Sequence, residues 1–426
     1  MSPRGEDALI IPALEPTGPR RSRQERAVIV TDLLSGTICL STREGPGPWK
    51  GFKAFEQESP VASFPELYEG HAGILERERG EHGRKCVGTL CSYVPVELIH
   101  SFGVIPVRIW GRPENVDISD ALLQPFICPP VRQLMALGME GRYEFLDGIV
   151  HCYTCDATCG LYNIWVRNLK PGFSHMVSLP YVDIDEARAY AVAELEALVD
   201  ALESLTRQGF SPESLGRSIA LYNEARSLSR EVYRLKAGGF RADYLDIHYM
   251  NLCAQVLPVE TFLPRLEEFV EELPRRGRGS GGRARLLLSG SVINDDSLLA
   301  FIEQRGGEIV ADDTCLGLRL LGDAIPDREP LESVASYYLG RTPCASRADF
   351  PSRKRYILET VGAFEVDAVI FVHQKFCDAH LSDHPFLKRV LDDAGIPSTR
   401  LELEGVGFDG QVRTRIESFF EMLEAR

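Results

Sequence analysis

The fold of this chain is decided by residues 85–110, which read KCVGTLCSYVPVELIHSFGVIPVRIW. Residues 85–89 form a short, partly apolar segment that is typical of a strand. Residues 94–100 carry a proline near their start, where a helix tolerates the missing N–H group. Residues 103–110 are mostly apolar and predict a buried strand. This alternation of strand and helix across short loops predicts a parallel, doubly wound sheet.

The same alternation extends over most of the chain and is interrupted by a helical middle. Further strands are expected at 147–152, 286–288, 308–311, 366–372 and 399–403, with helices at 65–84, 133–139, 158–167 and 411–423. The middle carries three expected helices, at 185–207, from 211 to about 236, and at 260–273. We therefore predict an α/β fold with two doubly wound parallel-sheet lobes of the Rossmann or flavodoxin type, joined by a helical connector.

The predicted organisation has four parts, and an arginine- and glycine-rich stretch precedes the last of them. The parts are an N-terminal extension at 1–60, an N-terminal α/β lobe at 61–184, the helical connector at 185–274 and a C-terminal α/β lobe at 283–426. Residues 275–285 read RRGRGSGGRAR, which predicts a flexible, solvated linker. The alternative interpretation is a basic clamp for a phosphate-bearing ligand.

The composition is that of an ordinary globular protein with an acidic surface. The 426 residues are 44% hydrophobic and 26% charged, and 47 basic against 62 acidic side chains give a net charge of −15. This charge argues against nucleic acid or an anionic membrane as the main partner. The N-terminal residues lack a secretory pattern, and no apolar run approaches the roughly 20 residues of a membrane-spanning helix. We therefore expect a cytoplasmic protein.

The 11 cysteines point most directly to chemistry. A reducing compartment disfavours disulfides, which leaves metal binding, catalysis or simple burial. In open parallel sheets, ligands bind at the carboxyl ends of the strands. Several thiols lie where such a site would be built: Cys91, Cys128, Cys155, Cys315 and Cys377. This distribution predicts a thiolate-ligated metal site, whereas burial in the core is the interpretation for Cys39 and Cys253.

The spacing of the cysteines argues against several common sites. Cys152, Cys155 and Cys159 form a CxxCxxxC run, but a structural zinc site would need a second CxxC pair, which the sequence lacks. The run reverses the motif of radical S-adenosylmethionine enzymes and differs from the continuous ferredoxin run. No Cys–His hydrolase signature surrounds a cysteine, and no phosphate-binding loop motif is present.

Three histidines lie near Cys377 and are candidates for metal binding or proton transfer. They are His373, which ends an expected strand, and His380 and His384 further along. The alternative for each is a polar loop residue.

Ten blocks of sequence follow one another in an order that matches a known pattern. They are CSYVPVELIHSFGVIPVR (91–108), CPPVR (128–132), DGIV (147–150), TCD (154–156), LYNIW (161–165), YNE (222–224), LSGS (288–291), DDTC (312–315), KFCD (375–378) and TRIE (414–417). In these blocks the chain resembles the 2-hydroxyacyl-CoA dehydratase and benzoyl-CoA reductase family. The resemblance covers nearly all of the chain from about residue 80 onward, and it rests on the common order of the blocks.

The resemblance implies an iron–sulfur subunit. In that family two related subunits each bind a four-iron cubane cluster through three cysteines, which match Cys91, Cys128 and Cys377 here, and one iron stays open. An ATP-hydrolysing iron–sulfur activator supplies an electron, which passes to the thioester carbonyl of an acyl-CoA and makes a ketyl-type radical. Dehydratases then expel the 2-hydroxyl group, and the reductases reduce an aromatic ring. Ser92 and His373 are the expected catalytic candidates.

Three alternatives stay open beside this interpretation. Six further thiols could hold a second cubane, as in double-cubane reductases of small molecules: Cys86, Cys152, Cys155, Cys159, Cys315 and Cys344. The chain could instead be a non-catalytic electron-transfer or assembly subunit, or a plain α/β binding protein with buried thiols. The expected partners are a sister subunit of the same family or a second copy of the chain, the ATP-dependent activator and an acyl-CoA. No nucleic acid or membrane is expected.

Overall fold

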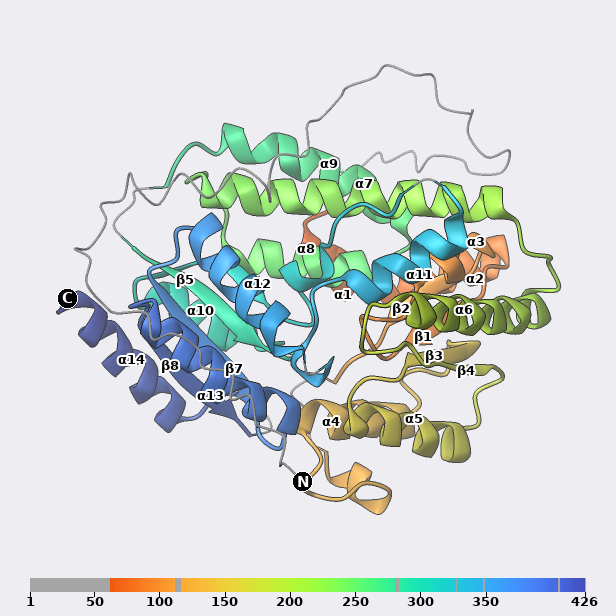
Figure 1. Cartoon of the computed structure of the whole chain (residues 1–426), viewed down its shortest axis with the longest axis horizontal. Coiled ribbons are helices and arrows are strands. Elements are labelled where there is room, and N and C mark those ends of the chain that lie inside the picture. The colour runs from red at the N-terminus through yellow and green to blue at the C-terminus, as the bar shows by residue number, and fades with distance from the viewer. Residues whose placement is uncertain are drawn as a thin grey trace, which may run out of the picture. The chain divides into compact units, whose positions relative to one another are not determined.

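The described part of the chain forms two four-stranded parallel sheets (Figure 1). The computed structural model describes residues 62–111, 116–279, 283–326, 328–347, 349–404 and 407–425. The first sheet has the order β2-β1-β3-β4 and consists of β1 (Cys86–Thr89), β2 (Ile105–Arg108), β3 (Gly148–Cys152) and β4 (Ser174–Val177). The second has the order β6-β5-β7-β8 and consists of β5 (Ala284–Gly290), β6 (Gly307–Asp313), β7 (Ala368–Gln374) and β8 (Ser398–Leu403). The predicted α/β class with two doubly wound lobes is confirmed. The extension predicted at 1–60 lies outside the described residues.

The strands are apolar because helices cover both faces of each sheet. Every residue of β7 is buried, as expected for an inner strand of a parallel sheet. In β5, Leu286 and Leu288 belong to one hydrophobic cluster, whereas Leu287 belongs to another. Successive side chains of a strand point to opposite faces, so this alternation identifies two separate layers of core.

Short helices connect the strands of the first sheet. They are α3 (Val96–Ser101), α4 (Pro129–Met139) after the 3-10 helix η2 (Asp117–Ala121), and α5 (Asp156–Leu169). The single helix predicted over 65–84 is wrong, because α1 (Phe64–Glu69) and α2 (His71–His82) are separate helices on either side of Gly70. Ser63 begins α1 with a capping box, since its side chain accepts from the Glu66 N–H and the Glu66 carboxylate accepts from the Ser63 N–H.

The predicted helical middle has four long helices rather than three. Three of them match the prediction: α6 (Asp185–Thr206), α7 (Pro212–Ala237) and α9 (Val259–Arg275). The helix α8 (Tyr244–Val256) was not predicted, because its buried residues occur on all of its sides and leave no polar stripe to reveal the helical period. The helices α7 and α9 pack against each other (Figure 1).

One helix of the C-terminal half packs on the N-terminal half. The helix α11 (Pro330–Gly340) lies between β6 and β7 in sequence but contacts α6 and α7 (Figure 1). Its residues Val334 and Tyr338 share a hydrophobic cluster with Val87 of β1. This packing carries the segments that flank α11 to the first sheet. The four-part division of the chain stays a prediction.

The other elements of the C-terminal half surround the second sheet. They are α10 (Asp296–Gln304), η3 (Leu318–Leu320), η4 (Ala345–Arg347), α12 (Phe350–Ala363), α13 (Asp378–Asp393) and α14 (Gly410–Glu424). None of the helices in the described ranges has both the length and the apolar character needed to cross a membrane.

The arginine-rich stretch at 275–285 is described except for 280–282. Arg276 pairs with Asp246 and Glu272, and Arg278 donates to the Gly238 carbonyl. Ala284 begins the pairing of β5 with β6, and the next residue, Arg285, donates to the Phe364 carbonyl. These three guanidinium groups thus bind to the chain itself, and the predicted linker and the alternative basic clamp both stay untested.

Candidate functional site

Five cysteines occupy loops after strands or the cap positions of helices. Cys91 comes two residues after β1, and Cys315 comes two residues after β6. Cys128, Cys155 and Cys377 are the N-cap residues of α4, α5 and α13. The unpaired N–H groups of a first helical turn favour negative charge, and therefore the thiolate form of a nearby cysteine. The structure places all five where the sequence predicted, while their role as metal ligands stays a prediction.

The thiols of the two halves interact with one another. Burial raises the pKa of the Cys128 thiol, and the neighbouring Cys377 and Cys155 thiols raise it further. Burial raises the pKa of Cys155 to about 12, and Cys91 and Cys377 add to this effect. Cys155 therefore links the three predicted ligands, Cys91, Cys128 and Cys377, into one group.

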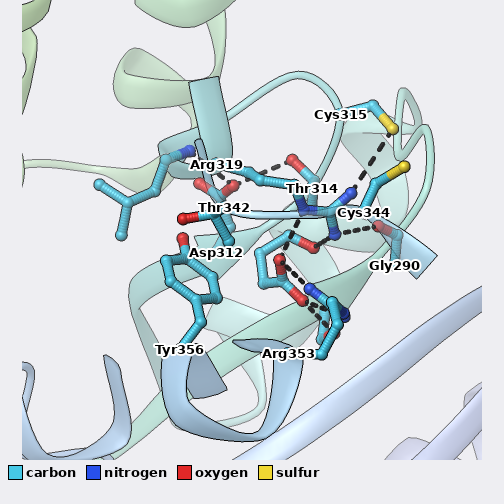
Figure 2. A network of polar contacts seen from close by, with 12 residues as sticks. Gly290, Asp312, Thr314, Cys315, Arg319, Thr342, Cys344, Arg353 and Tyr356 are labelled. Atoms are coloured by element: carbon cyan, nitrogen blue, oxygen red, sulfur yellow. Dashed lines mark hydrogen bonds and ion pairs between the residues drawn. The ribbon is translucent and has the colours of Figure 1, made fainter. Parts of the chain in front are cut away.

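Two further thiols, Cys315 and Cys344, lie side by side next to Arg319 (Figure 2). The Nη1 atom of Arg319 is 3.7 Å from the Cys315 sulfur. Burial raises the pKa of Cys315 to about 11; Arg319 opposes this rise, whereas Cys344 and Cys91 add to it. Cys344 also interacts with Cys377. The thiol group, as named from here on, comprises Cys91, Cys128, Cys155, Cys315, Cys344 and Cys377.

A buried carboxylate holds Arg319 in place. Nε of Arg319 donates to Oδ1 of Asp313 at 2.6 Å, and Nη2 donates to the Gly290 carbonyl at 3.0 Å. Arg353 donates to both carboxylate oxygens of Asp313, at 3.0 and 2.9 Å. Burial alone would raise the pKa of Asp313, but Arg319 and Arg353 together hold it well below its usual range. Asp313 therefore stays charged and fixes Arg319 beside Cys315.

Arg108, the last residue of β2, is a second cation beside the thiol group. Burial lowers the pKa of its guanidinium group, whereas the thiols of Cys91, Cys315 and Cys155 favour its charged form. Its Nε has no hydrogen-bond partner, and no carboxylate among the described residues forms an ion pair with it. A buried cation without a carboxylate is costly unless another anion balances it. Thiolates bound to a metal would supply that negative charge.

A cavity of about 110 Å³ lies against Cys91. Its walls come from the ends of β1 and β2, from α7, α8 and α11, and from the segment at 320–321. Its charged lining residues are Arg108, Arg226 and Arg341, and Ser92 also lines it. A second cavity of about 370 Å³ lies at the start of α11 and shares Tyr337 and Arg341 with the first.

The predicted catalytic residues lie in different surroundings. Ser92 lines the cavity beside Cys91, and its carbonyl accepts a hydrogen bond from Arg341. His373 is buried in β7 and packs on His384, with 5.2 Å between the ring centroids. Burial lowers the pKa of His373 to about 3, and His384 lowers it further. His373 does not line the cavity, and catalytic roles for Ser92 and His373 stay predictions.

Tyr93, the neighbour of Ser92, supports the loops around the thiol group. Its hydroxyl group donates to the Thr342 carbonyl at 3.1 Å and accepts from the Cys344 N–H at 3.3 Å. The guanidinium groups of Arg341 and Arg347 lie over the ring of Tyr93, at 5.1 and 4.9 Å from its centroid. Tyr93 thus ties the Cys91 loop to the Cys344 loop.

The remaining described cysteines are buried. Cys253 of α8 is buried in the hydrophobic core, and its thiol donates to the Phe64 carbonyl. Both observations agree with its interpretation as a core residue. Burial raises the pKa of Cys86 to about 12. Cys152 interacts with Cys91, and Cys159 lies 3.6 Å from the His151 ring. Cys39 is outside the described residues.

The donors of the thiol group are of the kind that an iron–sulfur cluster uses, because thiolates are its usual ligands and each cysteine binds a different iron. Within the described parts of the chain, no three His, Cys, Asp or Glu side chains are arranged to hold one metal ion. Soft thiolates with two adjacent arginines suit a negatively charged cluster of this kind.

The arginines of the site were not identified by sequence reasoning. Arg108 ends an apolar strand, and a charge at the end of a buried strand is a usable signal. Arg319 and Arg341 carry no such signal, because their burial follows from the packing of the η3 segment and α11.

Comparison with known proteins adds a family to this geometry. A family model described as "2-hydroxyglutaryl-CoA dehydratase, D-component" matches residues 91–423, a range that includes the whole thiol group. One of the subunits of the benzoyl-CoA reductase of Thauera aromatica is 26% identical over 351 residues, covering 79% of this chain and 90% of that protein. The β subunit of the lactoyl-CoA dehydratase of Anaerotignum propionicum is 26% identical over 374 residues, covering 86% and 99%. The β subunit of the (R)-2-hydroxyglutaryl-CoA dehydratase of Acidaminococcus fermentans is 24% identical over 384 residues, covering 85% and 98%.

Proposed function

From the premise that the chain belongs to the 2-hydroxyglutaryl-CoA dehydratase D-component family, we propose that it is the iron–sulfur subunit of an acyl-CoA dehydratase or reductase. Cys91, Cys128 and Cys377 would hold a four-iron cluster and leave one iron open. The observation that carries the proposal is the convergence of thiols from both halves of the chain into one half-buried group, built from loops after strands and from helix N-caps. Relatives named as dehydratase and reductase subunits support the reaction class.

The cluster, when bound, supplies a low-potential electron for the thioester carbonyl of an acyl-CoA. The surrounding residues would balance the negative charge of the thiolates. Arg108 and Arg319 place positive charge beside the thiolates, and Asp313 keeps Arg319 there. The raised pKa values of Cys128, Cys155 and Cys315 mean that these thiols are protonated before metal binds, so that loading releases protons.

Partners follow from the same proposal. The relatives are named as subunits of larger enzymes, which supports a sister subunit for this chain. An ATP-hydrolysing iron–sulfur activator would deliver the electron. Calorimetry with a CoA thioester tests the substrate: binding is expected, and a chain that holds a cluster without affinity for any CoA thioester would favour an electron-transfer or assembly subunit.

Anaerobic reconstitution tests the cluster itself. We expect the full chain to bind four irons and matching sulfide and to give an EPR signal on reduction. The triple variant Cys91→Ala, Cys128→Ala and Cys377→Ala should lose the iron, whereas the core variant Cys253→Ala should keep it. A wild-type chain that stays free of iron would contradict the proposal.

The thiol group favours a second candidate, a double-cubane reductase of small molecules. The thiols of Cys155, Cys315 and Cys344 interact with those of the predicted ligands. One open cubane needs only three cysteine ligands, so these three thiols are additional. This candidate predicts eight irons per chain, about half of which are lost in the double variant Cys315→Ala and Cys344→Ala. A wild-type content of four irons, unchanged in that variant, excludes it.

A further inference from the structure

The cavity beside Cys91 contains one buried positive charge that nothing described balances. Arg226 and Arg341 both line it and are only 8% and 9% exposed. Arg226 forms an ion pair with Glu97, whose side chain is fully buried, so this pair is neutral. Arg341 donates to the carbonyls of Ser92 and Arg319, which carry no charge, and no described carboxylate pairs with it.

Each of these two arginines also has an unused hydrogen-bond donor. The Nε atoms of Arg226 and Arg341 are buried and have no partner among the described residues. Both guanidinium groups lie over the ring of Tyr337, at 4.9 and 5.8 Å from its centroid, and their two charges interact with each other. Leaving two buried N–H donors unpaired is costly, and a small acceptor bound between them would remove that cost.

Arg108, the third arginine of the cavity, is differently placed. Its electrostatic partners are the thiols of Cys91, Cys155 and Cys315, so the thiol group balances its charge once a cluster is bound. The lining of the cavity then has a net charge of +1, which comes from Arg341, because no Asp or Glu lines the cavity in the described part of the chain. A ligand with a single negative charge would therefore neutralise the cavity.

We propose that this cavity binds a carboxylate group between Arg226 and Arg341, next to Cys91. The volume of about 110 Å³ is well below the roughly 300–1,000 Å³ of pockets for drug-sized ligands, which suits a carboxylate and a short stem. A whole CoA thioester needs far more room, so only the tip of an acyl chain could enter. The adjoining cavity of about 370 Å³ meets the first at Arg341 and Tyr337, but Asp323, Glu329 and Glu332 line it, so it does not suit a second anionic group.

This inference deepens the proposed function, because it assigns the substrate class: an acyl-CoA with a carboxylate on its acyl group, or a free carboxylate. Both sources share one chemistry, in which a guanidinium group binds a carboxylate through charge-assisted hydrogen bonds. Arg226 and Arg341 are held by Glu97 and by backbone carbonyls rather than by the thiol group, so the site can also be tested on the metal-free chain. In that form Arg108 is a second unbalanced positive charge of the cavity, which also favours a carboxylate.

Calorimetry on the full wild-type chain, with its iron content measured first, provides the test. Acetate and acetamide have nearly the same shape, but only acetate is charged. We expect acetate to bind at least about tenfold more tightly than acetamide, as a charged hydrogen bond implies. Glutaryl-CoA binding at least about tenfold more tightly than butyryl-CoA identifies the acyl tip as the source, whereas equal binding of the two with acetate preferred identifies a free carboxylate. Equal binding of acetate and acetamide, or no binding of either, overturns the inference.

Variants localise the site. Arg341→Gln removes the unbalanced charge and should weaken acetate binding about tenfold or more, and Arg341→Lys should restore part of it. Arg265→Gln is the matched control, because Arg265 is also 9% exposed but lies in α9 outside the cavity; its affinity should be unchanged. The acetate and acetamide comparison needs no variant and decides the question even where Arg341→Gln fails to fold. An iron-loaded chain without acetate preference overturns this inference alone, whereas an iron-free chain that prefers acetate overturns the proposed function alone.

Discussion

Replacing Asp313 with asparagine removes a buried negative charge between Arg319 and Arg353 and keeps the shape of the side chain. Asp313 is fully buried, and the two arginine side chains are 3% and 1% exposed. Its carboxylate accepts three guanidinium hydrogen bonds of 2.6 to 3.0 Å and a fourth bond of 2.9 Å from Ser289. The Asp313→Asn variant would leave both arginines without this carboxylate.

The size of the effect follows from what each arginine has left. Removing one partner of a buried ion pair costs about 3–5 kcal/mol, because the other charge stays buried and unbalanced. Arg353 keeps a carboxylate, that of Asp383 at 3.0 Å, whereas Arg319 keeps two backbone carbonyls and the Cys315 thiol, which are uncharged in the metal-free chain. One uncompensated arginine rather than two places the expected loss of unfolding free energy near the lower end, at about 3 kcal/mol.

Urea unfolding of the metal-free full chain at pH 7 measures this loss. The matched control is Asp392→Asn, which breaks the pair with Lys388 on the surface of α13, where the two side chains are 53% and 47% exposed. An exposed pair of this kind contributes about 0.5 kcal/mol or less. A loss below about 1 kcal/mol for Asp313→Asn, close to that of the control, would refute the reasoning.

Three further changes have defined expectations. In Gly290→Ala the new Cβ would lie 2.1 Å from the Val372 carbonyl oxygen. The free energy of unfolding in the same urea assay should therefore be lower than that of the wild type by at least about 1–3 kcal/mol. An unchanged free energy of unfolding would contradict the clash. Tyr244→Phe deletes a 2.9 Å hydrogen bond to the fully buried Asp312 carboxylate and should cost about 1–3 kcal/mol, whereas a neutral result would mean that Asp312 is satisfied without it. Burial lowers the pKa of His373 to about 3, against about 6.5 when unfolded, so the unfolded state binds more protons between these pH values and stability falls as the pH drops from 6.5. His373→Gln should reduce the loss between pH 7 and pH 5 by about 2 kcal/mol, and equal pH profiles of variant and wild type would contradict the assigned burial.

Most of the fold could be predicted because its elements repeat local patterns. The strand, helix and strand of residues 85–110 appear as β1, α3 and β2. The helix α8 was not predicted, because it is buried on nearly all sides and its sequence therefore shows no helical alternation of polar and apolar residues. The docking of α11 onto α6 and α7 could not be predicted, since it depends on the fit of two surfaces that are distant in sequence.

The site divides in the same way. The positions of Cys91 and Cys377 follow from the rule that sites form at strand ends, whereas Cys128 precedes a helix, and its choice as a ligand came from the family resemblance. The approach of Cys344 to Cys315 depends on the segment after α11, and the burial of Arg341 depends on that helix itself. Arginines are usually exposed, so no local pattern could indicate that these would be enclosed.

Mössbauer spectroscopy of the chain reconstituted with ⁵⁷Fe tests the central claim most directly. If Cys91, Cys128 and Cys377 hold a four-iron cluster and one iron lacks a cysteine ligand, the spectrum should contain two components in a ratio of three to one. The minor component should change when a ligand is added, and the major component should not. A spectrum with no protein-bound iron, or one in which all irons are equivalent and insensitive to added ligand, would contradict the account.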